Sequence, residues 1–214
     1  MSATNESTDQ NLPSWELAWK TGSTHWDVGE SQPSLKEAIK SSGIDFPRTG
    51  RALVPGCGSG YDVEYISIAL GLDTLGLEVA ETAIKKAREL IEKAKPLHPG
   101  IVANIVNQDF FAFDPPEREH FELVYDHMFF GAIPHSMRNE WGKQMAKLIK
   151  PGGHLVTIAF PLFPEFEGGP PPYIKPEHYE EVLHSNFVKV LDKIPEASSA
   201  SHEGKERLMI WRRL

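Results

Sequence analysis

Short apolar segments alternate with amphipathic segments through the middle of this chain. The clearest amphipathic segment spans residues 80–95, where apolar residues such as Ile84, Ala87 and Ile91 fall on one helical stripe. Strands that alternate with helices predict right-handed strand–helix–strand units, and hence a mostly parallel sheet with helices on both faces. We therefore expect an α/β protein. The expected strands are Arg51–Pro55, Asp73–Leu77, Ile101–Asn107, Phe121–His127 and His154–Phe160, and the expected helices are Tyr61–Leu70, Ala80–Lys95 and Pro134–Lys150.

The C-terminal part of the chain departs from this alternation. A Pro/Gly-rich loop over residues 161–176 leads into a helix near residues 176–184. Two apolar strands follow, Phe187–Ile194 and Glu206–Arg213, and the polar loop between them is too short for a helical crossover. This spacing predicts an antiparallel hairpin at the end of the sheet.

The N-terminal part is expected to begin with a polar, disordered tail over residues 1–13. Short helices are expected at Trp15–Lys20 and Pro33–Ser42, with a loop between them. A chain of 214 residues is in the range of one domain, which we expect to span residues 14–214.

Composition narrows the class of protein. The net charge of −8 and pI near 5.6 argue against a basic face for nucleic acid. The single cysteine excludes an internal disulfide, and no segment approaches the ~20 apolar residues of a membrane span. No secretory signal is recognisable, so we expect a cytoplasmic protein with no membrane partner. The nine histidines show no metal-ligand spacing, and His178 and His184 would lie on different faces of a helix, so no metal is expected.

The turn between the first expected strand and helix is rich in glycine. It reads Val54-Pro55-Gly56-Cys57-Gly58-Ser59-Gly60, at the carboxyl end of a strand, where open α/β sheets bind ligands. The sequence lacks the Gly-Lys-Ser/Thr of a triphosphate loop, and Tyr61 stands where a dinucleotide fingerprint has its third glycine. A small group such as an amino-acid moiety therefore fits this turn better than a pyrophosphate does.

Acidic residues follow the next strands in order. Glu78 comes eighteen residues after Gly60, where a carboxylate accepts hydrogen bonds from ribose hydroxyls. Asp109 and Phe110 follow the third strand, where an acid can bind an adenine amine and an aromatic ring can stack on the base. A glycine turn, a ribose acid and an adenine acid in this order predict S-adenosylmethionine as the cofactor. Asp126, at the end of the fourth strand, completes the expected cofactor residues, which include Gly56, Gly58 and Gly60.

Stretches along nearly the whole chain from Trp15 onward resemble the thiol/halide methyltransferases of the thiopurine S-methyltransferase-like group, within the class I S-adenosylmethionine-dependent methyltransferases. These stretches are WELAWKTGSTHWDVG, RALVPGCGSGYDV, GLEVAETAIKKA, QDFFAF, YDHMFFGAI, MRNEWGKQMAKLIKPGGHLVTIAFP, EGGPPPY and GKERLMIWRRL. The resemblance implies a Rossmann-like sheet of seven strands with an antiparallel last strand. It also implies that Trp15, Trp19 and Trp26 contact the cofactor or belong to an N-terminal lid over it, expected within residues 14–43. His25 departs from the proline that is usual before Trp26-Asp27.

The resemblance implies methyl transfer to small soft nucleophiles: halides, thiocyanate, hydrosulfide or small thiols. A soft anion needs only alignment and desolvation for direct in-line displacement, whereas a thiol near pKa ~8.5 is mostly protonated at neutral pH. By analogy Tyr173 is the first candidate on the acceptor side, and Arg138 and His127 are further candidates. Cys57 is interpreted as a packing residue, because no histidine partner can be assigned to it.

Three alternatives stay open. Phe129, Phe130, Phe163 and Phe166 could line a larger pocket for aromatic thiols or for oxygen or nitrogen acceptors. An NAD(P)-dependent oxidoreductase is disfavoured by the missing third glycine and by the late hairpin. A non-catalytic adenosyl-binding module would bind the cofactor without turnover. The partner expected is a small-molecule substrate, and the chain offers no signal for a protein partner, so a monomer is favoured.

Overall fold

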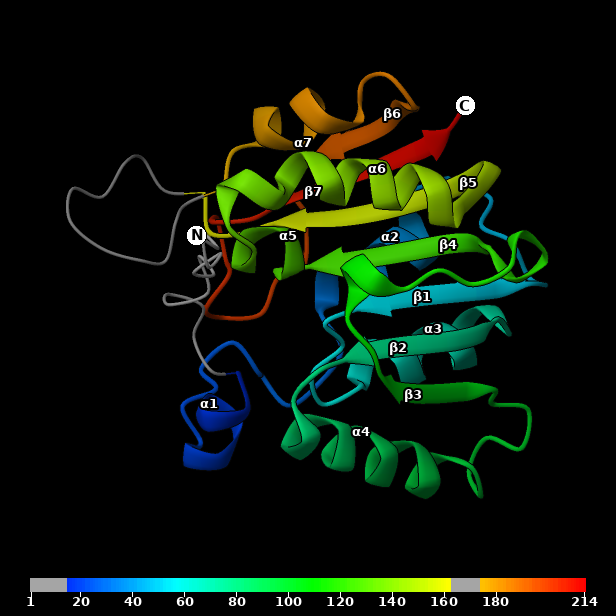
Figure 1. The fold of residues 1–214 in the computed structure, drawn as a ribbon, viewed down its shortest axis with the longest axis vertical. Coiled ribbons are helices and arrows are strands. Elements are labelled where there is room, and N and C mark those ends of the chain that lie inside the picture. The colour runs from blue at the N-terminus through cyan, green and yellow to red at the C-terminus, as the bar shows by residue number, and fades with distance from the viewer. Residues whose placement is uncertain (1–14, 163–173) are drawn as a thin grey trace, which may run out of the picture.

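A twisted sheet of seven strands forms the centre of the molecule (Figure 1). The computed structural model describes residues 15–162 and 174–214. The strand order is β3-β2-β1-β4-β5-β7-β6, and β7 is antiparallel to both of its neighbours. This arrangement confirms the expected α/β fold with an antiparallel C-terminal hairpin. The strands are β1 (Arg51–Pro55), β2 (Asp73–Glu78), β3 (Ala103–Asn107), β4 (Phe121–His127), β5 (Ile149–Ala159), β6 (Phe187–Lys193) and β7 (Arg207–Arg213).

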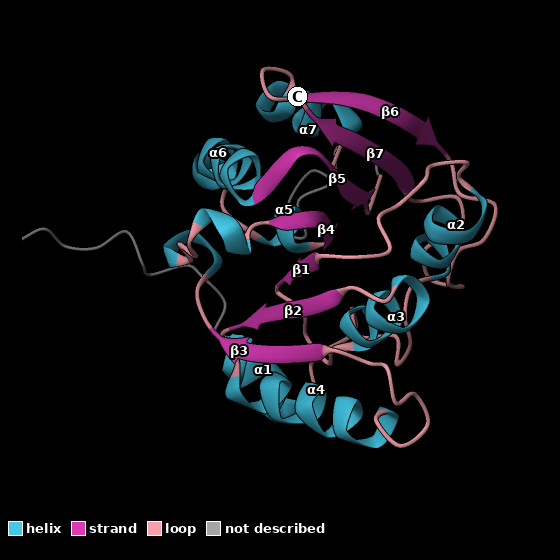
Figure 2. Cartoon of the chain, turned by 90° about the vertical axis from the view of Figure 1, so that its right-hand side faces the viewer, coloured by secondary structure: helices cyan, strands magenta, loops and turns pink. Residues whose placement is uncertain are grey.

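Helices cover both faces of this sheet, with α2 and α3 on one side and α6 on the other (Figure 2). Residues of α2, α3 and α4 pack into one hydrophobic core with the sheet, and residues of α6 and α7 pack into a second. The predicted stripe of α4 is buried, as its periodicity requires. The helices are α1 (Trp15–Thr21), α2 (Pro33–Ser41), α3 (Tyr61–Leu70), α4 (Glu81–Ala94), α5 (Phe129–Ala132), α6 (Arg138–Leu148) and α7 (Pro176–Leu183), with 3-10 turns at Phe110–Ala112, Glu117–Glu119 and His135–Met137.

The direction of chain progression reverses between β1 and β4. From β1 the chain moves outward through β2 to β3, then returns to place β4 on the other side of β1. Loops that leave neighbouring strands in opposite directions open a crevice at their carboxyl ends, which is where α/β sheets bind ligands. The carboxyl ends of β1, β2 and β4 therefore define the region of the candidate site.

The expected helix Pro134–Lys150 is wrong at both ends. A 3-10 turn occupies its start, and α6 ends at Leu148 because Ile149 already pairs with Phe121 of β4. The register advances five positions along β5, from Ile149 to His154, while it advances two along β4, from Phe121 to Leu123. A bulge therefore holds the Pro-Gly-Gly sequence within the strand. The short helix α5 is not predicted by the sequence pattern.

Two expected segments lie largely or wholly outside the described residues: the tail over residues 1–13 and most of the Pro/Gly-rich loop over residues 161–176. Within the described ranges, no helix is long and apolar enough to cross a membrane.

Candidate functional site

The glycine turn after β1 packs too tightly for side chains. Gly56, Gly58 and Gly60 have φ values of 58°, 53° and 81°, a region that side-chain-bearing residues rarely adopt. A Cβ on Gly60 would lie 2.8 Å from the Cβ of Ala87, and one on Gly56 would lie 2.6 Å from Cδ2 of Phe129. The turn therefore brings bare backbone to the carboxyl edge of the sheet, with α4 on one side and α5 on the other.

Glu78 ends β2 beside this turn and organises its backbone. Its Oε2 accepts a hydrogen bond from the Gly58 N–H at 3.0 Å, and its Oε1 accepts from the N–H groups of Val79 and Ala80 at 2.8 and 2.9 Å. The side chain is 7% exposed. The structure thus brings Glu78 and the glycine turn together, as the sequence predicted.

Three tryptophans form an aromatic cluster at the same edge. The ring of Trp26 meets Trp15 edge-on at 5.6 Å between centroids and Trp19 at 6.3 Å. Trp19 is buried, and its Cζ2 lies 3.3 Å from the position that a Cβ on Gly58 would take. The cluster therefore lies directly against the glycine turn.

Helix α1, which carries two of these tryptophans, is fixed to the start of α4 (Figure 1). Both carboxylate oxygens of Glu16 accept hydrogen bonds from Thr82, one from its N–H at 3.0 Å and one from its Oγ1 at 2.9 Å. Thr82 lowers the pKa of Glu16, chiefly through the backbone hydrogen bond, although burial acts in the opposite direction. In contrast, α2 contributes Leu35 and Ala38 to the core against the sheet. Of the expected lid over residues 14–43, α1 and the loop after it lie at the site.

Sequence reasoning did not assign a role to Asp27. Its Oδ2 accepts a hydrogen bond of 2.6 Å from the Ser59 hydroxyl in the glycine turn, and its Oδ1 accepts from the Gly29 N–H. The Trp26-Asp27 sequence motif was the only signal for this residue in the sequence analysis. The contact with Ser59 joins residues 32 positions apart, so no pattern of neighbouring residues predicts it.

Asp109 and Phe110 follow β3 at the same edge of the sheet. Asp109 is exposed and caps a 3-10 turn, since its Oδ1 accepts a hydrogen bond of 2.9 Å from the Phe111 N–H. Phe110 is buried, and its ring meets those of Phe111 and Phe129 at 5.2 Å. Asp109 faces solvent while Phe110 packs beneath it.

Asp126 lies fully inside the protein at the end of β4. Its carboxylate accepts hydrogen bonds from the Phe130 N–H at 3.2 Å and from Nε1 of Trp141 at 2.8 Å. Burial raises the pKa of Asp126 to about 7, although these hydrogen bonds favour its charged form. Met128, with φ of 67°, turns the chain into α5 directly afterwards. In this position Asp126 holds α5 in place beside the glycine turn.

The acceptor candidates occupy different places. His127 is half-buried at the end of β4, and burial, aided by His202, lowers its pKa to about 3, so it is neutral at physiological pH. Arg138 lies on the opposite side of the sheet, stacked over Phe130 with its NH1 3.2 Å from Nδ1 of His178. Burial lowers the pKa of Arg138. Tyr173 lies outside the described residues. The structure thus does not bring His127 and Arg138 together.

Cys57 packs inside the glycine turn. Its Sγ lies 2.6 Å from the position of a Cβ on Gly76, and burial, together with the charge of Glu78, raises the pKa of its thiol. These contacts agree with the interpretation of Cys57 as a packing residue. Within residues 15–162 and 174–214, no group of three or more His, Cys, Asp or Glu side chains is placed to hold a metal ion.

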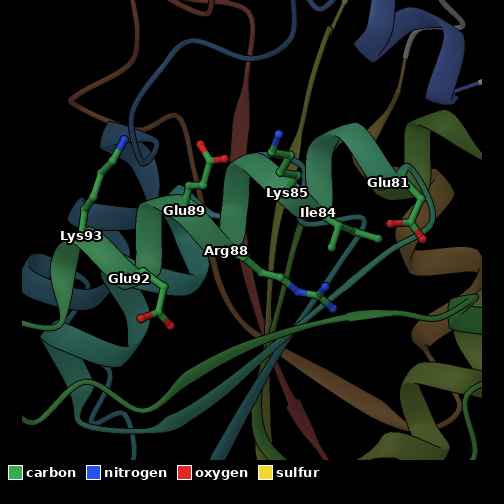
Figure 3. A pocket seen from close by; sticks show the side chains of 7 residues that line it. All are labelled: Glu81, Ile84, Lys85, Arg88, Glu89, Glu92 and Lys93. Carbon is green, nitrogen blue, oxygen red and sulfur yellow. The ribbon is translucent and has the colours of Figure 1, made fainter.

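A surface hollow of about 520 Å³ lies along α4, and residues of that helix line it (Figure 3). Glu81, Lys85, Glu89 and Lys93 on its wall carry balanced charges, as the i,i+4 pattern predicts for a solvated helix. Arg88 reaches toward β3, where its Nε and NH2 donate to the carbonyl of Ile105 at 3.2 and 2.9 Å. This hollow is therefore a solvated helix surface rather than the candidate site.

The site fits S-adenosylmethionine on three grounds. The bare glycine turn admits close approach of the amino-acid moiety, and the Glu78 carboxylate at the next strand end is suited to ribose hydroxyls. The tryptophan cluster offers ring surfaces of the kind that attract a sulfonium cation.

Comparison with known proteins gives consistent similarities. The family model of thiopurine S-methyltransferase matches residues 10–212. Thiocyanate methyltransferase 1 of Brassica oleracea is 36% identical over 204 residues, which cover 94% of this chain and 84% of the relative. The probable thiol methyltransferase 2 of Arabidopsis thaliana is 33% identical over 202 residues, covering 93% of this chain and 84% of the relative.

Solved structures share the fold. A magnesium protoporphyrin IX methyltransferase from Synechocystis with bound S-adenosylmethionine superposes with a TM-score of 0.69 at 16% identity, over 99% of this chain and 100% of that one. An N-methyltransferase from Bradyrhizobium japonicum in complex with S-adenosylhomocysteine gives 0.66 at 16% identity, over 92% of this chain and 97% of that one. The chain therefore has the fold of these methyltransferases.

Proposed function

The chain belongs to the thiopurine S-methyltransferase family and is an S-adenosylmethionine-dependent methyltransferase, and we propose that its acceptor is a small soft nucleophile: a thiol, hydrosulfide, thiocyanate or a halide. The observation that carries this proposal is the meeting of the glycine turn, Glu78 and the tryptophan cluster at one edge of the sheet. Two relatives that span nearly the whole chain are named as thiol and thiocyanate methyltransferases, which supports a small sulfur acceptor.

On the donor side, the proposal gives each part of the edge a separate task. Gly56, Gly58 and Gly60 admit the amino-acid end of the cofactor, and Glu78 accepts hydrogen bonds from its ribose. Asp109, which is exposed after β3, is proposed to bind the adenine amine, with the buried Phe110 next to it. Asp126 acts indirectly, because its buried carboxylate fixes the start of α5.

The tryptophan cluster has the task of favouring the charged donor. S-adenosylmethionine supplies an electrophilic methyl group on a sulfonium. Trp15, Trp19 and Trp26 form the aromatic wall that is proposed to favour that cation and to exclude water from this side of the turn. Desolvation strengthens a soft anion as a nucleophile, so alignment and water exclusion suffice for thiocyanate or a halide.

On the acceptor side, His127 lies at the carboxyl end of β4 and its imidazole is neutral. If it contacted an anionic acceptor, it would not neutralise the charge of that anion. Arg138, on the other face, supports α5 through its contact with Phe130. Tyr173 is retained as an acceptor-side residue, on family analogy. Substitution Tyr173→Phe is expected to leave the affinity for S-adenosylmethionine unchanged and to slow transfer; a loss of cofactor binding would reassign the residue.

Formation of S-adenosylhomocysteine tests the proposal against a panel of iodide, bromide, thiocyanate, hydrosulfide, thiophenol and a thiopurine. Turnover on the small anions supports it. Turnover confined to the aromatic thiols would instead favour a pocket for larger acceptors. That second candidate function is suggested by the thiopurine S-methyltransferase of Legionella pneumophila (strain Paris), which is 27% identical over 85% of this chain and 86% of its own length. Cofactor binding without any turnover would leave a non-catalytic binding module, and NAD(P) binding would point to an oxidoreductase.

A further inference from the structure

The loop between β6 and β7 buries a histidine–glutamate pair. His202 and Glu206 are 2% and 1% exposed, and Nδ1 of His202 lies 2.8 Å from Oε2 of Glu206. The other oxygen of Glu206 accepts a hydrogen bond of 2.6 Å from the Ser198 hydroxyl. Both carboxylate oxygens are therefore engaged, and the orientation of the pair is fixed.

This loop is packed against the carboxyl ends of β4 and β5. The ring of His202 stacks on Phe160, which follows β5, at 3.7 Å between centroids, and lies 5.3 Å from the ring of His127. Because β4 is the neighbour of β1 in the sheet, the pair lies on the β4 side of the crevice whose other side holds the glycine turn. His202 is thus placed on the acceptor side of the proposed site.

Polar atoms around the pair are buried without partners. Among the described residues, neither Nε2 of His127 nor the hydroxyl of Tyr125 has a hydrogen-bond partner. Burial raises the pKa of the Tyr125 hydroxyl, and the charges of Asp62 on α3 and Glu206 raise it further. The titratable groups that contact His202 are therefore Glu206 on its own loop and His127 on β4. Tyr125 on β4 lies within electrostatic reach of Glu206 and of Asp62. Buried polar atoms without partners indicate a place for a polar ligand or water.

The two histidines differ in what they can do with a proton. Among the residues that the structure describes, no carboxylate pairs with His127, and its lowered pKa makes it a poor proton acceptor. An ionised Glu206 carboxylate can only accept a hydrogen bond, so the His202 tautomer that pairs with it carries its hydrogen on Nδ1. In that tautomer the Nε2 lone pair can take up a proton, and the carboxylate stabilises the resulting imidazolium. A carboxylate-oriented histidine of this kind is the usual form of a general base.

We propose that His202, oriented by Glu206, is the general base that accepts the proton of a neutral thiol acceptor; this inference rests on the proposed function. The S–H bond of the thiol breaks and its proton moves to Nε2 of His202. The thiol sulfur forms a bond to the methyl carbon, and the bond from that carbon to the sulfonium sulfur breaks, with its electron pair going to that sulfur. Glu206 is a positioning residue, because it acts through His202.

The role separates two classes of acceptor that the same site would serve. Thiocyanate and iodide have no proton to lose, so their methylation gains nothing from a base. An alkyl thiol near pKa ~8.5 is mostly protonated at neutral pH and depends on one. His202 therefore determines whether the enzyme accepts neutral thiols in addition to anions.

The test compares His202→Asn and Glu206→Gln with the wild type on 2-mercaptoethanol and on thiocyanate. With the thiol at neutral pH, kcat is expected to fall about 100-fold or more in His202→Asn, the contribution typical of general base catalysis. Glu206→Gln is expected to lower kcat for the thiol with KM unchanged. Turnover of thiocyanate stays at the wild-type level in both variants, which also shows that they fold. His184→Asn, at an exposed histidine that ends α7, is the matched control and is expected to match the wild type on both acceptors.

The pH profile and nitrogen NMR supply readouts that a merely structural role would not move. As the pH falls below the pKa of the thiol, ~8.5, kcat for the thiol is expected to fall more steeply in His202→Asn, which depends on free thiolate, than in the wild type, whereas kcat for thiocyanate is expected to be alike in the two proteins. Imidazole 15N shifts, measured without the methyl donor, are expected to show His202 with its proton on Nδ1. In Glu206→Gln the proportion with the proton on Nε2 is expected to rise.

Equal loss of both acceptors in His202→Asn would overturn the inference and leave His202 with a structural role. Full thiol activity in that variant would overturn it as well, as would a His202 ring protonated on Nε2 in the wild type. A wild type that methylates neither thiocyanate nor the thiol would overturn the proposed function, and the base role with it.

Discussion

Substitution Glu78→Gln tests the donor side of the site with almost no change in shape. The glutamine carbonyl can still accept from the N–H groups of Val79 and Ala80, but its NH2 group then faces the Gly58 N–H and the ribose hydroxyls lose an anionic acceptor. A hydrogen bond to a charged group contributes about 1.5–3 kcal/mol, so the Kd for S-adenosylmethionine is expected to rise about 10- to 150-fold. The free energy of unfolding measured without the cofactor is expected to fall by a similar amount, because one bond that holds the turn is lost.

Isothermal titration calorimetry measures the Kd, and urea unfolding measures the stability. Glu81→Gln is the control. Glu81 lies three residues after Glu78, and its exposed carboxylate accepts a hydrogen bond from Asn107, so this substitution removes the same negative charge outside the turn. A Kd that changes by less than about threefold in Glu78→Gln, well below the value of one charged hydrogen bond, would show that the carboxylate only shapes the turn. An equal rise of the Kd in both variants would show that only the overall negative charge at this edge matters, not a hydrogen bond from the ribose to Glu78.

Three further predictions follow from distances and burial described above. Gly60→Ala places a Cβ 2.8 Å from Ala87 and is expected to lose about 1–3 kcal/mol of unfolding free energy beyond the loss in Gly43→Ala. The control Gly43→Ala shares the backbone penalty of a positive φ, but its Cβ meets no atom of the described residues within 4 Å. Equal losses in urea unfolding would contradict the packing argument. Trp26→Leu is expected to raise the Kd for S-adenosylmethionine about 2- to 30-fold and to change that for S-adenosylhomocysteine less, because a cation–π contact acts on the sulfonium alone; calorimetry with both ligands decides. The pKa of Asp126 is raised from 3.8 to about 7, so between these pH values the folded protein keeps a proton that the unfolded chain loses. The stability contributed by this group is therefore present below pH ~4 and falls as the pH rises to ~7, by at most about 4 kcal/mol. Wild-type stability is therefore expected to fall more steeply over this window than that of Asp126→Asn, and identical slopes in chemical unfolding at several pH values would show that Asp126 is ionised throughout.

The alternation of strands and helices predicted the sheet because the apolar residues within each segment indicate which of its faces is buried. Strands β1 and β4 and helix α3 have the expected bounds, and the short spacing before β7 predicted the hairpin correctly. The boundary at residues 148–154 was missed because Ile149 pairs with Phe121, and a pairing partner in another strand has no local signature. Helix α5 has four residues, too few to show a helical period.

The same distinction applies to the candidate site. The glycine turn and Glu78 could be predicted because both follow directly from their positions at strand ends. The bonds from Asp27 to Ser59 and from Glu16 to Thr82 could not, since they join residues 32 and 66 positions apart. His202 and Glu206 are four residues apart, but in a polar loop such a spacing has no meaning until tertiary packing buries both.

The reversal of strand order at β1 and β4 divides the site between two parts of the chain. In the proposed site, the donor side draws on residues 15–110, and the acceptor side includes β4 and the β6–β7 loop. Under that proposal, a change in the β6–β7 loop would alter which nucleophiles are accepted, while the glycine turn and Glu78 keep their own contacts. New acceptor specificities can therefore arise in such a protein by exchange of one loop, without any loss of the cofactor on which every version of the reaction depends.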